Sequence, residues 1–245
     1  MARIFIPPEN IEGDTATLPE AEAKRLMRVL RLRPGDRVTL FDGVKEYSSV
    51  ITSIGTKSAE LKITGTIERA SEPSLFIILG QGFPKGERFE WALQKAVELG
   101  VSTVVPVIME RSVKRPDANA AARQLERFRR IATEAAQQSG RVCVPDVPCF
   151  MDLPMFLDVT RQADLKIVLY EGEKTIGLRE VLHGAKGAKM VALLVGPEGG
   201  LKPEEVDEAE ASGFVPCGLG PRILRTETAG IAAVSIIQFE LGDMG

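Results

Sequence analysis

Two neighbouring stretches decide the fold of this sequence: Leu193-Leu-Val-Gly-Pro-Glu-Gly-Gly-Leu201 and Leu219-Gly-Pro-Arg-Ile-Leu-Arg-Thr-Glu-Thr-Ala-Gly230. Each begins as an apolar run and stops at Gly-Pro, which is typical of a buried strand that ends in a tight loop. The first loop leads into a predicted helix over 203–213, and the second leads into a largely apolar helix over 229–239. Two glycine-bearing loops between strands and helices predict a ligand crevice at the carboxyl ends of adjacent strands.

The same alternation extends back along the chain to residue 74. Apolar strands are predicted at 75–79, 101–107, 166–170 and 190–195, and amphipathic helices at 87–99 and 120–138. Apolar strands separated by helices indicate a parallel sheet with helices on both faces. The fold class of this part is therefore α/β.

Residues 1–72 follow a different pattern. A short basic helix is predicted over 19–32, and three runs of β-forming residues follow it at 37–41, 46–52 and 59–64. Short strands at this spacing predict a small antiparallel barrel. The chain thus divides into a barrel domain, 1–72, and an α/β domain, 73–245, joined by a linker at 70–73.

The composition favours a globular protein without a structural metal site or a membrane-spanning segment. Hydrophobic residues make up 44% of the 245 residues and charged residues 27%, which is enough apolar content for a sizeable core. No apolar run is long enough to span a membrane and no signal-peptide pattern is present, so a cytoplasmic location is expected. The three scattered cysteines and single histidine predict free thiols and no structural metal site.

Three loops carry candidate chemistry. The loop over 196–200 has the glycines to approach a phosphate or an adenosine, although a tight turn that serves only packing explains it equally and it lacks the P-loop lysine. Arg225 and Glu227 lie where a loop enters a helix, with backbone N–H groups pointing outward. The alternative for these two residues is a capped helix start with a surface ion pair. Lys85 lies in a third such loop.

Basic residues fall into three clusters despite a net charge of −3. The clusters are Lys24, Arg25, Arg28, Arg31 and Arg33; Arg111, Lys114 and Arg115; and Arg123, Arg127, Arg129 and Arg130. Each cluster is either a solvated helix face or a set of contacts to nucleic-acid phosphates.

The paired motifs over 193–201 and 219–229 resemble the signature of the RsmE family, bacterial 16S ribosomal RNA uracil-N3 methyltransferases of the SPOUT superfamily. The similarity continues through the α/β part at 84–86, 95–101 and 134–141, and a weaker match lies at 27–36. Lys202 departs from the pattern, since a serine or threonine is expected to cap the following helix.

The resemblance implies a fold and a cofactor that periodicity does not reveal. It implies an N-terminal PUA-like β-barrel that binds RNA, and a SPOUT domain with a C-terminal trefoil knot, a bound S-adenosyl-L-methionine and a homodimeric assembly. The cofactor-binding residues that it implies are Tyr170, Glu171, Leu194, Gly196, Glu198, Gly199, Leu219, Gly220, Ile223, Leu224 and Thr228.

The implied substrate, a uridine in 16S ribosomal RNA or the small ribosomal subunit, sets the catalytic assignment. N3 lies on the Watson–Crick edge, so the base must be unpaired or flipped out, and N3 must lose its proton. We expect Arg225 to stabilise charge on the uracil oxygens or to orient the base, and Glu227, or a water that it holds, to accept the proton. The expected RNA-binding residues are Arg25, Arg28, Arg31, Lys85, Arg111, Arg123, Arg127 and Arg130.

Other classes of protein stay open on the sequence alone. One is a different RNA methyltransferase of the same superfamily, and another is a nucleotide-dependent α/β enzyme that uses the 196–200 loop for phosphate. A third is a non-catalytic RNA-binding factor in ribosome assembly. Titration with S-adenosylmethionine, NAD and ATP separates the first two, and a methyl-transfer assay separates the third.

Overall fold

The computed structural model describes residues 2–68, 72, 74–112 and 115–244. The chain forms two compact units, one from 1–72 together with 136–144 and one from 73–135 together with 145–245. Most of the predicted linker, namely residues 70, 71 and 73, lies outside the described residues, as does Lys114 of the second basic cluster.

The first unit is built on a six-stranded sheet in the order β1-β4-β5-β6-β3-β2. Its strands are β1 (Ala2–Phe5), β2 (Ile11–Glu12), β3 (Thr15–Pro19), β4 (Arg37–Phe41), β5 (Glu46–Ile54) and β6 (Ser58–Ile67), with a 3-10 turn, η1 (Pro8–Asn10), before β2. The last three strands confirm the three predicted runs. The expectation of only antiparallel strands was wrong, because β1 precedes the predicted elements and pairs in parallel with β4.

Helix α1 (Glu20–Arg28) packs on this sheet through its buried Ala23 and Leu26. Its first turn is acidic and its last turn is basic, which suits the dipole of the helix. The helix ends before the predicted residue 32, because Arg31 adopts the left-handed conformation with φ 55°. The Leu32 N–H then bonds back to the Leu26 carbonyl at 2.9 Å.

Segment 136–144 belongs to the first unit through charged contacts. The guanidinium of Arg3 pairs with the buried carboxylate of Glu46 at 2.5 Å and donates to the carbonyls of residues 136 and 141. Arg141 in turn pairs with Glu72 at 2.8 Å, and Glu72 also accepts the N–H groups of residues 142 and 143. These bonds join residues between 43 and 138 positions apart in the sequence, so no local pattern predicts them.

The second unit contains the predicted parallel sheet, in the order β12-β10-β11-β7-β8-β9. Its strands are β7 (Phe76–Gly82), β8 (Thr103–Ile108), β9 (Met151–Asp152), β10 (Leu165–Leu169), β11 (Met190–Val195) and β12 (Val215–Cys217). Every neighbouring pair is parallel, which confirms the α/β class. The strand that leads to the second motif, β12, ends at Cys217. The sequence predicted that this strand would include Leu219, the first residue of the motif.

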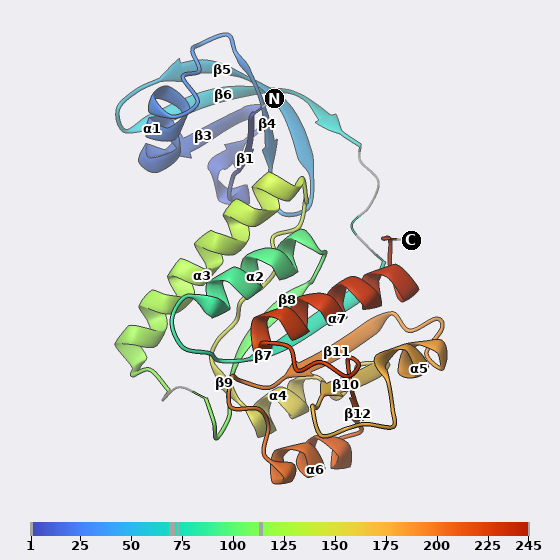
Figure 1. Cartoon of the computed structure of the whole chain (residues 1–245). Helices are drawn as coiled ribbons and strands as arrows, with labels where there is room; N and C mark the ends of the chain where they lie inside the picture. The colour runs from blue at the N-terminus through green and yellow to red at the C-terminus, as the bar shows by residue number, and fades with distance from the viewer. Residues whose placement is uncertain (1, 69–71, 73, 113–114, 245) are drawn as a thin grey trace. The chain divides into compact units, whose positions relative to one another are not determined.

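Helices cover the sheet of the second unit on both faces (Figure 1). They are α2 (Arg88–Glu98), α3 (Ala118–Ser139, which ends in the first unit), α4 (Leu153–Val159), α5 (Leu178–His183), α6 (Pro203–Ala211) and α7 (Thr226–Leu241). Figure 1 shows α2 and α7 side by side in front of the sheet, and these two helices pack against each other. The apolar residues of α4 and α6 form a core with the opposite side of the sheet.

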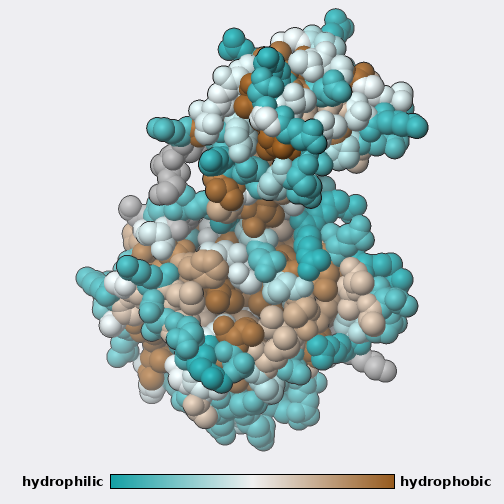
Figure 2. All heavy atoms as spheres, turned by 180° about the vertical axis from the view of Figure 1, so that it is seen from behind, coloured by the Kyte–Doolittle hydropathy of each residue, from teal (hydrophilic) through white to brown (hydrophobic). Residues whose placement is uncertain are grey.

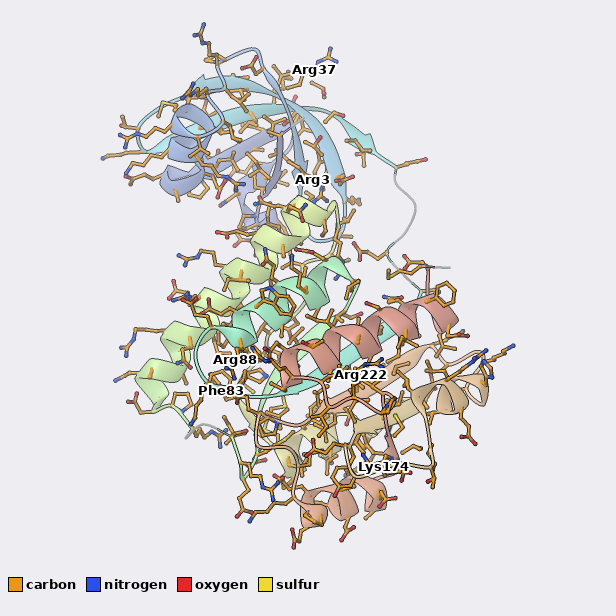
Figure 3. The ribbon with its side chains drawn as sticks, in the orientation of Figure 1. Arg3, Arg37, Phe83, Arg88, Lys174 and Arg222 are labelled. Carbon is orange, nitrogen blue, oxygen red and sulfur yellow. The ribbon has the colours of Figure 1, made fainter. Side chains whose placement is uncertain are left out.

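The surface is mixed in polarity. Figure 2 shows the side hidden in Figure 1, where hydrophilic residues dominate the edges and hydrophobic residues gather in the middle of the second unit. Figure 3 shows Arg37 at the outer edge of the first unit, with its side chain pointing to solvent. Within the described ranges, no helix combines the length and the apolarity that a membrane crossing requires.

Candidate functional site

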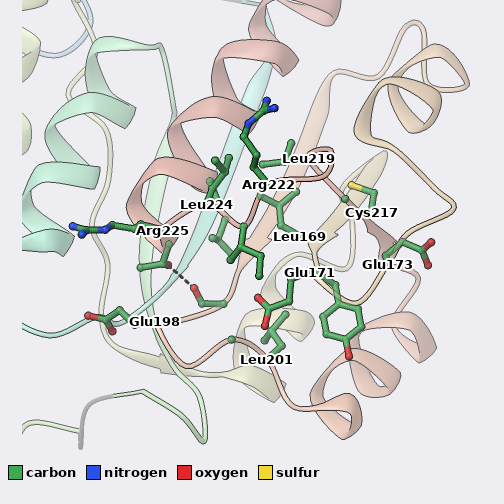
Figure 4. Close-up of a pocket in the computed structure, with 18 of the residues that line it drawn as sticks. Leu169, Glu171, Glu173, Glu198, Leu201, Cys217, Leu219, Arg222, Leu224 and Arg225 are labelled. Atoms are coloured by element: carbon green, nitrogen blue, oxygen red, sulfur yellow. Dashed lines mark hydrogen bonds between the residues drawn. The ribbon is translucent and has the colours of Figure 1, made fainter.

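A cavity of about 430 Å³ lies at the carboxyl ends of β10, β11 and β12 (Figure 4). Three loops line it, over 170–174, 196–201 and 217–226. The second and third are the loops of the two motifs, and the first follows β10. The cavity lies at the edge of the parallel sheet where the sequence predicts a ligand crevice.

Most of the residues expected around the cofactor come together at this cavity. Those that line it are Tyr170, Glu171, Gly196, Glu198, Gly199, Leu219, Gly220, Ile223 and Leu224, together with the expected catalytic residue Arg225. The backbone brings them together because each loop directly follows a strand of the same sheet.

Three expected site residues do not line the cavity. Leu194 is fully buried in the core with α4 and α6, because alternate side chains of β11 face opposite sides of the sheet and its neighbour Val195 faces the cavity. Thr228 is exposed on the first turn of α7. Glu227 lies on the same turn, and its Oε2 atom is buried with no hydrogen-bond partner among the described residues.

Several lining residues escape sequence reasoning. Arg88 reaches the cavity from α2, Cys217 closes it from the end of β12, and Glu173 and Lys174 border it from the loop after β10. Their signal is weak because each lies outside the two motifs. The loop after β10 was identifiable only as the end of a predicted strand.

The loop over 196–201 is held by its neighbours. Glu198 accepts the backbone N–H of Lys85 at 2.9 Å and the guanidinium of Arg88 at 2.6 Å. From the segment after β8, Arg111 donates to the carbonyl of Gly199 at 2.9 Å. Lys85 and Arg111, which were expected to bind RNA, therefore also support this loop.

Two glycines allow the loops to approach other groups closely. A Cβ atom on Gly82, at the end of β7, would lie 2.4 Å from the backbone nitrogen of Pro197. Gly200 has φ +71°, and a Cβ atom there would lie 2.6 Å from a carboxylate oxygen of Glu171. Neither position accepts a larger side chain without movement of the cavity wall.

The loop after β10 is stabilised by Glu173. Its carboxylate accepts the hydroxyl of Thr175 and the N–H groups of Thr175 and Ile176, the latter two at 2.6 and 3.0 Å. The hydrogen bond from the Thr175 side chain, followed by those from the backbone, holds the pKa of Glu173 at about 2. Glu173 is therefore a carboxylate at neutral pH, and it fixes the wall of the cavity.

The cavity carries both signs of charge. Its acidic side chains are Glu171, Glu173 and Glu198, and its basic side chains are Arg88, Lys174, Arg222 and Arg225. Figure 3 shows Arg88, Lys174 and Arg222 on different elements of the second unit, and Figure 4 shows Arg222 pointing away from Glu171. This arrangement suits a polar ligand that itself carries positive and negative groups.

Cys217 is poorly suited to act as a nucleophile in this cavity. Burial, followed by the nearby carboxylate of Glu173, raises the pKa of Cys217 to about 12. The side chain is therefore a protonated thiol at neutral pH and lacks the reactivity of a thiolate. In the part of the chain that the structure describes, no group of His, Cys, Asp and Glu residues could hold a metal ion.

The start of α7 borders the cavity. Arg225 is the N-cap residue, and its side chain does not cap the helix, so the first N–H groups of α7 lack a side-chain acceptor there. The hydroxyl of Thr226 donates to the carbonyl of Gly196 at 2.5 Å, the bond drawn as a dashed line in Figure 4. Arg225 is therefore anchored beside the loop over 196–200, which we call the first bend.

The basic residues expected to bind RNA differ in their contacts. Arg25 pairs with Glu22, and Arg127 pairs with Glu90. Those that are exposed and make no ion pair with another described residue are Arg28, Arg31, Arg123 and Arg130. The first two belong to the first unit and the last two to the second.

Comparisons with known families match both parts of the chain. A family described as an RNA methyltransferase PUA domain matches residues 18–64, and one described as an RNA methyltransferase domain matches residues 71–238. The chain is 34% identical to the ribosomal RNA small subunit methyltransferase E of Bacillus subtilis, over 94% of this chain and 91% of the relative. It is 33% identical to the protein of the same name from Synechocystis, over 96% of this chain and 76% of the relative.

A solved structure gives the same result. The chain is similar to the crystal structure of a ribosomal RNA small subunit methyltransferase E from Neisseria gonorrhoeae bound to S-adenosyl methionine. The identity is 36%, the TM-score is 0.90, and the match covers 100% of both chains.

Proposed function

Because the chain belongs to the ribosomal RNA small subunit methyltransferase E family, we propose that it transfers a methyl group from S-adenosylmethionine to N3 of a uridine in 16S ribosomal RNA. The observation that carries this proposal is the cavity at the carboxyl edge of the sheet, which is lined by both motifs and by Arg225. A related structure of the same name contains the cofactor.

The residues of the cavity fit this cofactor. A volume of about 430 Å³ lies in the range typical of small-molecule sites. Glu171 and Glu198 are suited to the positive sulfonium and ammonium groups, and Lys174 and Arg222 to the carboxylate. The glycine-bearing bends allow backbone groups to approach the adenine. When bound, S-adenosylmethionine supplies an electrophilic methyl group.

Arg225 is the residue that we assign to the base. It lines the cavity at the start of α7, where the helix dipole and the free N–H groups favour negative charge. Its guanidinium stabilises charge on the uracil oxygens as N3 loses its proton and attacks. Alignment of N3 with the methyl group supplies much of the remaining acceleration.

Glu227 has a less direct role in this proposal. Its side chain does not line the cavity, so we assign proton acceptance to a water that it holds and not to direct contact with N3. The residue follows Arg225 closely on α7, which keeps the carboxylate near the same end of the site. Glu227→Gln is expected to lower kcat less than removal of Arg225.

The function is tested on ribosomal RNA from cells that lack this protein. We expect the purified protein with S-adenosylmethionine to add one methyl group to a single uridine of 16S ribosomal RNA, located by mass mapping of nuclease fragments. Naked RNA and assembled small subunits are assayed side by side, because the structure is compatible with either substrate. Absence of methylation on both substrates would refute the proposal.

RNA binding is assigned to the unpaired arginines of the first unit. Replacing both Arg28 and Arg31 by alanine is expected to reduce the slope of log affinity against log salt concentration by roughly 1.4 to 1.8, since each lost phosphate contact removes about 0.7 to 0.9. Fluorescence anisotropy with a labelled RNA between low and moderate salt measures the slope. Lys62→Ala, which removes an exposed lysine paired with Asp14 in the same unit, is the control and should leave it unchanged.

We further propose that the protein is a homodimer. Trp91 on α2 is 47% exposed, and Ile236 and Phe239 on α7 are 38% and 61% exposed. Because α2 and α7 pack against each other, these apolar side chains lie on neighbouring helices (Figure 1). Exposed apolar residues of this size favour burial against a second copy. We also propose the cytoplasmic location that the sequence predicts, and methylation of ribosomal RNA supports it.

The trefoil knot is also part of the proposal. The Gly218 N–H bonds to the carbonyl of Ile176 at 2.9 Å, and the Leu178 N–H bonds to the carbonyl of Gly218 at 3.1 Å. The end of β12 is therefore hydrogen-bonded to residues 176–178, which lie between β10 and α5. This contact supports a path in which the next residues, over 219–225, pass through that loop before α7 begins.

A further inference from the structure

A fully buried glutamine lies at the end of the central strand β7. Gln81 is 0% exposed, and its strand neighbours are Val195 of β11 and Pro106 of β8. An amide in such a place costs free energy unless it is hydrogen-bonded. The methylation chemistry assigned above does not use this residue, so its contacts call for an explanation.

The amide of Gln81 starts a chain of two hydrogen bonds. Its Nε2 atom donates to the hydroxyl of Thr226 at 2.7 Å, and that hydroxyl donates to the carbonyl of Gly196 at 2.5 Å. Thr226 is 6% exposed, so water does not compete strongly for these bonds. We call Gln81, Thr226 and Gly196 the relay.

The relay connects the two walls of the cavity. Thr226 directly follows Arg225, and Gly196 opens the first bend. The hydroxyl of Thr226 both accepts and donates, so it is the only member that touches both other groups. A displacement of the start of α7 relative to Gly196 strains the Thr226–Gly196 bond, and a displacement relative to β7 strains the Gln81–Thr226 bond.

Close packing on both sides leaves the relay little freedom. A Cβ atom on Gly230 of α7 would lie 2.8 Å from Oε1 of Gln81, so the helix approaches the amide as closely as a glycine permits. Next to Gln81, Gly82 packs against the bend at Pro197 in the same way. Both the first bend and α7 thus pack against the end of β7.

We propose that Gln81 is a positioning residue. It holds Arg225 in a fixed position relative to the first bend through the hydroxyl of Thr226. This role rests on the proposed methyl transfer. Gln81 itself does not line the cavity. Without the relay the sheet and its apolar cores persist, but Arg225 and the bend are free to shift against each other.

The test compares kcat with stability in four single variants of the full chain. Gln81→Met and Thr226→Val remove the relay and are expected to lower kcat at saturating S-adenosylmethionine about 100-fold, the loss typical of a misplacement of roughly 1 Å. Thr226→Ser keeps the hydroxyl and is expected to restore kcat relative to Thr226→Val. Gln137→Met is the matched control. Gln137 is also buried, but it belongs to the first unit, where its side chain accepts the N–H of Phe5.

The control separates positioning from folding. We expect Gln81→Met and Gln137→Met to lower Tm by similar amounts, since each loses one buried hydrogen bond, while only Gln81→Met loses kcat. The double variant Gln81→Met/Thr226→Val should be no slower than the slower single variant, because both substitutions break the same chain of bonds.

Two results would overturn the inference. One is wild-type kcat in Gln81→Met. The other is additive loss in the double variant together with equal kcat in Thr226→Ser and Thr226→Val. Failure of the proposed function is recognised separately, because then the wild-type protein itself would not methylate ribosomal RNA.

Discussion

Arg225→Ala is expected to lower kcat for methylation roughly 100- to 1000-fold, the loss typical when a single group that stabilises transition-state charge is removed. The uracil carries negative charge as N3 attacks, and Arg225 is the basic residue that lies at the start of α7 beside the first bend. The side chain is exposed and does not cap the helix, so its loss should leave the fold intact. Single-turnover methyl transfer measures the effect, with Tm and the Kd for S-adenosylmethionine recorded alongside.

Arg179→Ala is the control for this substitution. Arg179 is an exposed arginine on α5 in the same unit and does not line the cavity, so its removal changes the net charge equally. Its kcat should equal that of the wild type. Turnover of Arg225→Ala within a few-fold of the wild type would remove Arg225 from the mechanism. A large rise in Kd with unchanged kcat would reassign it to cofactor binding.

Gly82→Ala is expected to abolish measurable cofactor binding. Its new methyl group would lie 2.4 Å from the nitrogen of Pro197 and 2.7 Å from the carbonyl carbon of Gly196, both of them backbone atoms that cannot turn aside. The bend must therefore move away from β7, which opens the wall formed by the first motif. Overpacking of this kind costs about 1–3 kcal/mol of stability, so the protein should still fold.

Isothermal titration with S-adenosylmethionine measures the loss, and thermal unfolding shows whether the fold persists. Gly184→Ala is the control, because a Cβ atom there meets only the carbonyl of Val181 at 3.6 Å, which is an ordinary contact. Unaltered affinity in a folded Gly82→Ala protein would mean that the bend at Gly196 does not form the cofactor site.

The α/β fold was predictable because its signals are local. Four strands of the second unit, β7, β8, β10 and β11, coincide with apolar runs in the sequence, and Gly-Pro marks the end of β11 directly. From there the carboxyl edge of the sheet and the two motif loops follow. What the first motif does not reveal is the side to which each residue points, and so Leu194 was assigned to the cavity when its neighbour Val195 is the one that faces it.

The remaining parts of the site depend on contacts between distant residues. Glu173 shapes a wall of the cavity only because it bonds to Thr175 and Ile176 once the turn has formed. The Gln81–Thr226 bond spans 145 positions, and a glutamine inside an apolar strand looks from sequence alone like an imperfect core residue. Such groups are recognisable only when the partner is known.

The return of segment 136–144 to the first unit has a consequence for anyone dissecting the protein. In a fragment that ends at residue 72, Arg3 would lose two of its hydrogen-bond acceptors and Glu72 would lose its ion pair with Arg141. Both charged groups would then be left partly buried without these partners. The recombinant PUA-like module is therefore best made as a chimera, in which a short tether appends residues 136–144 after residue 72. The same discontinuity means that a single genetic crossover at residue 72 would separate this module from segment 136–144.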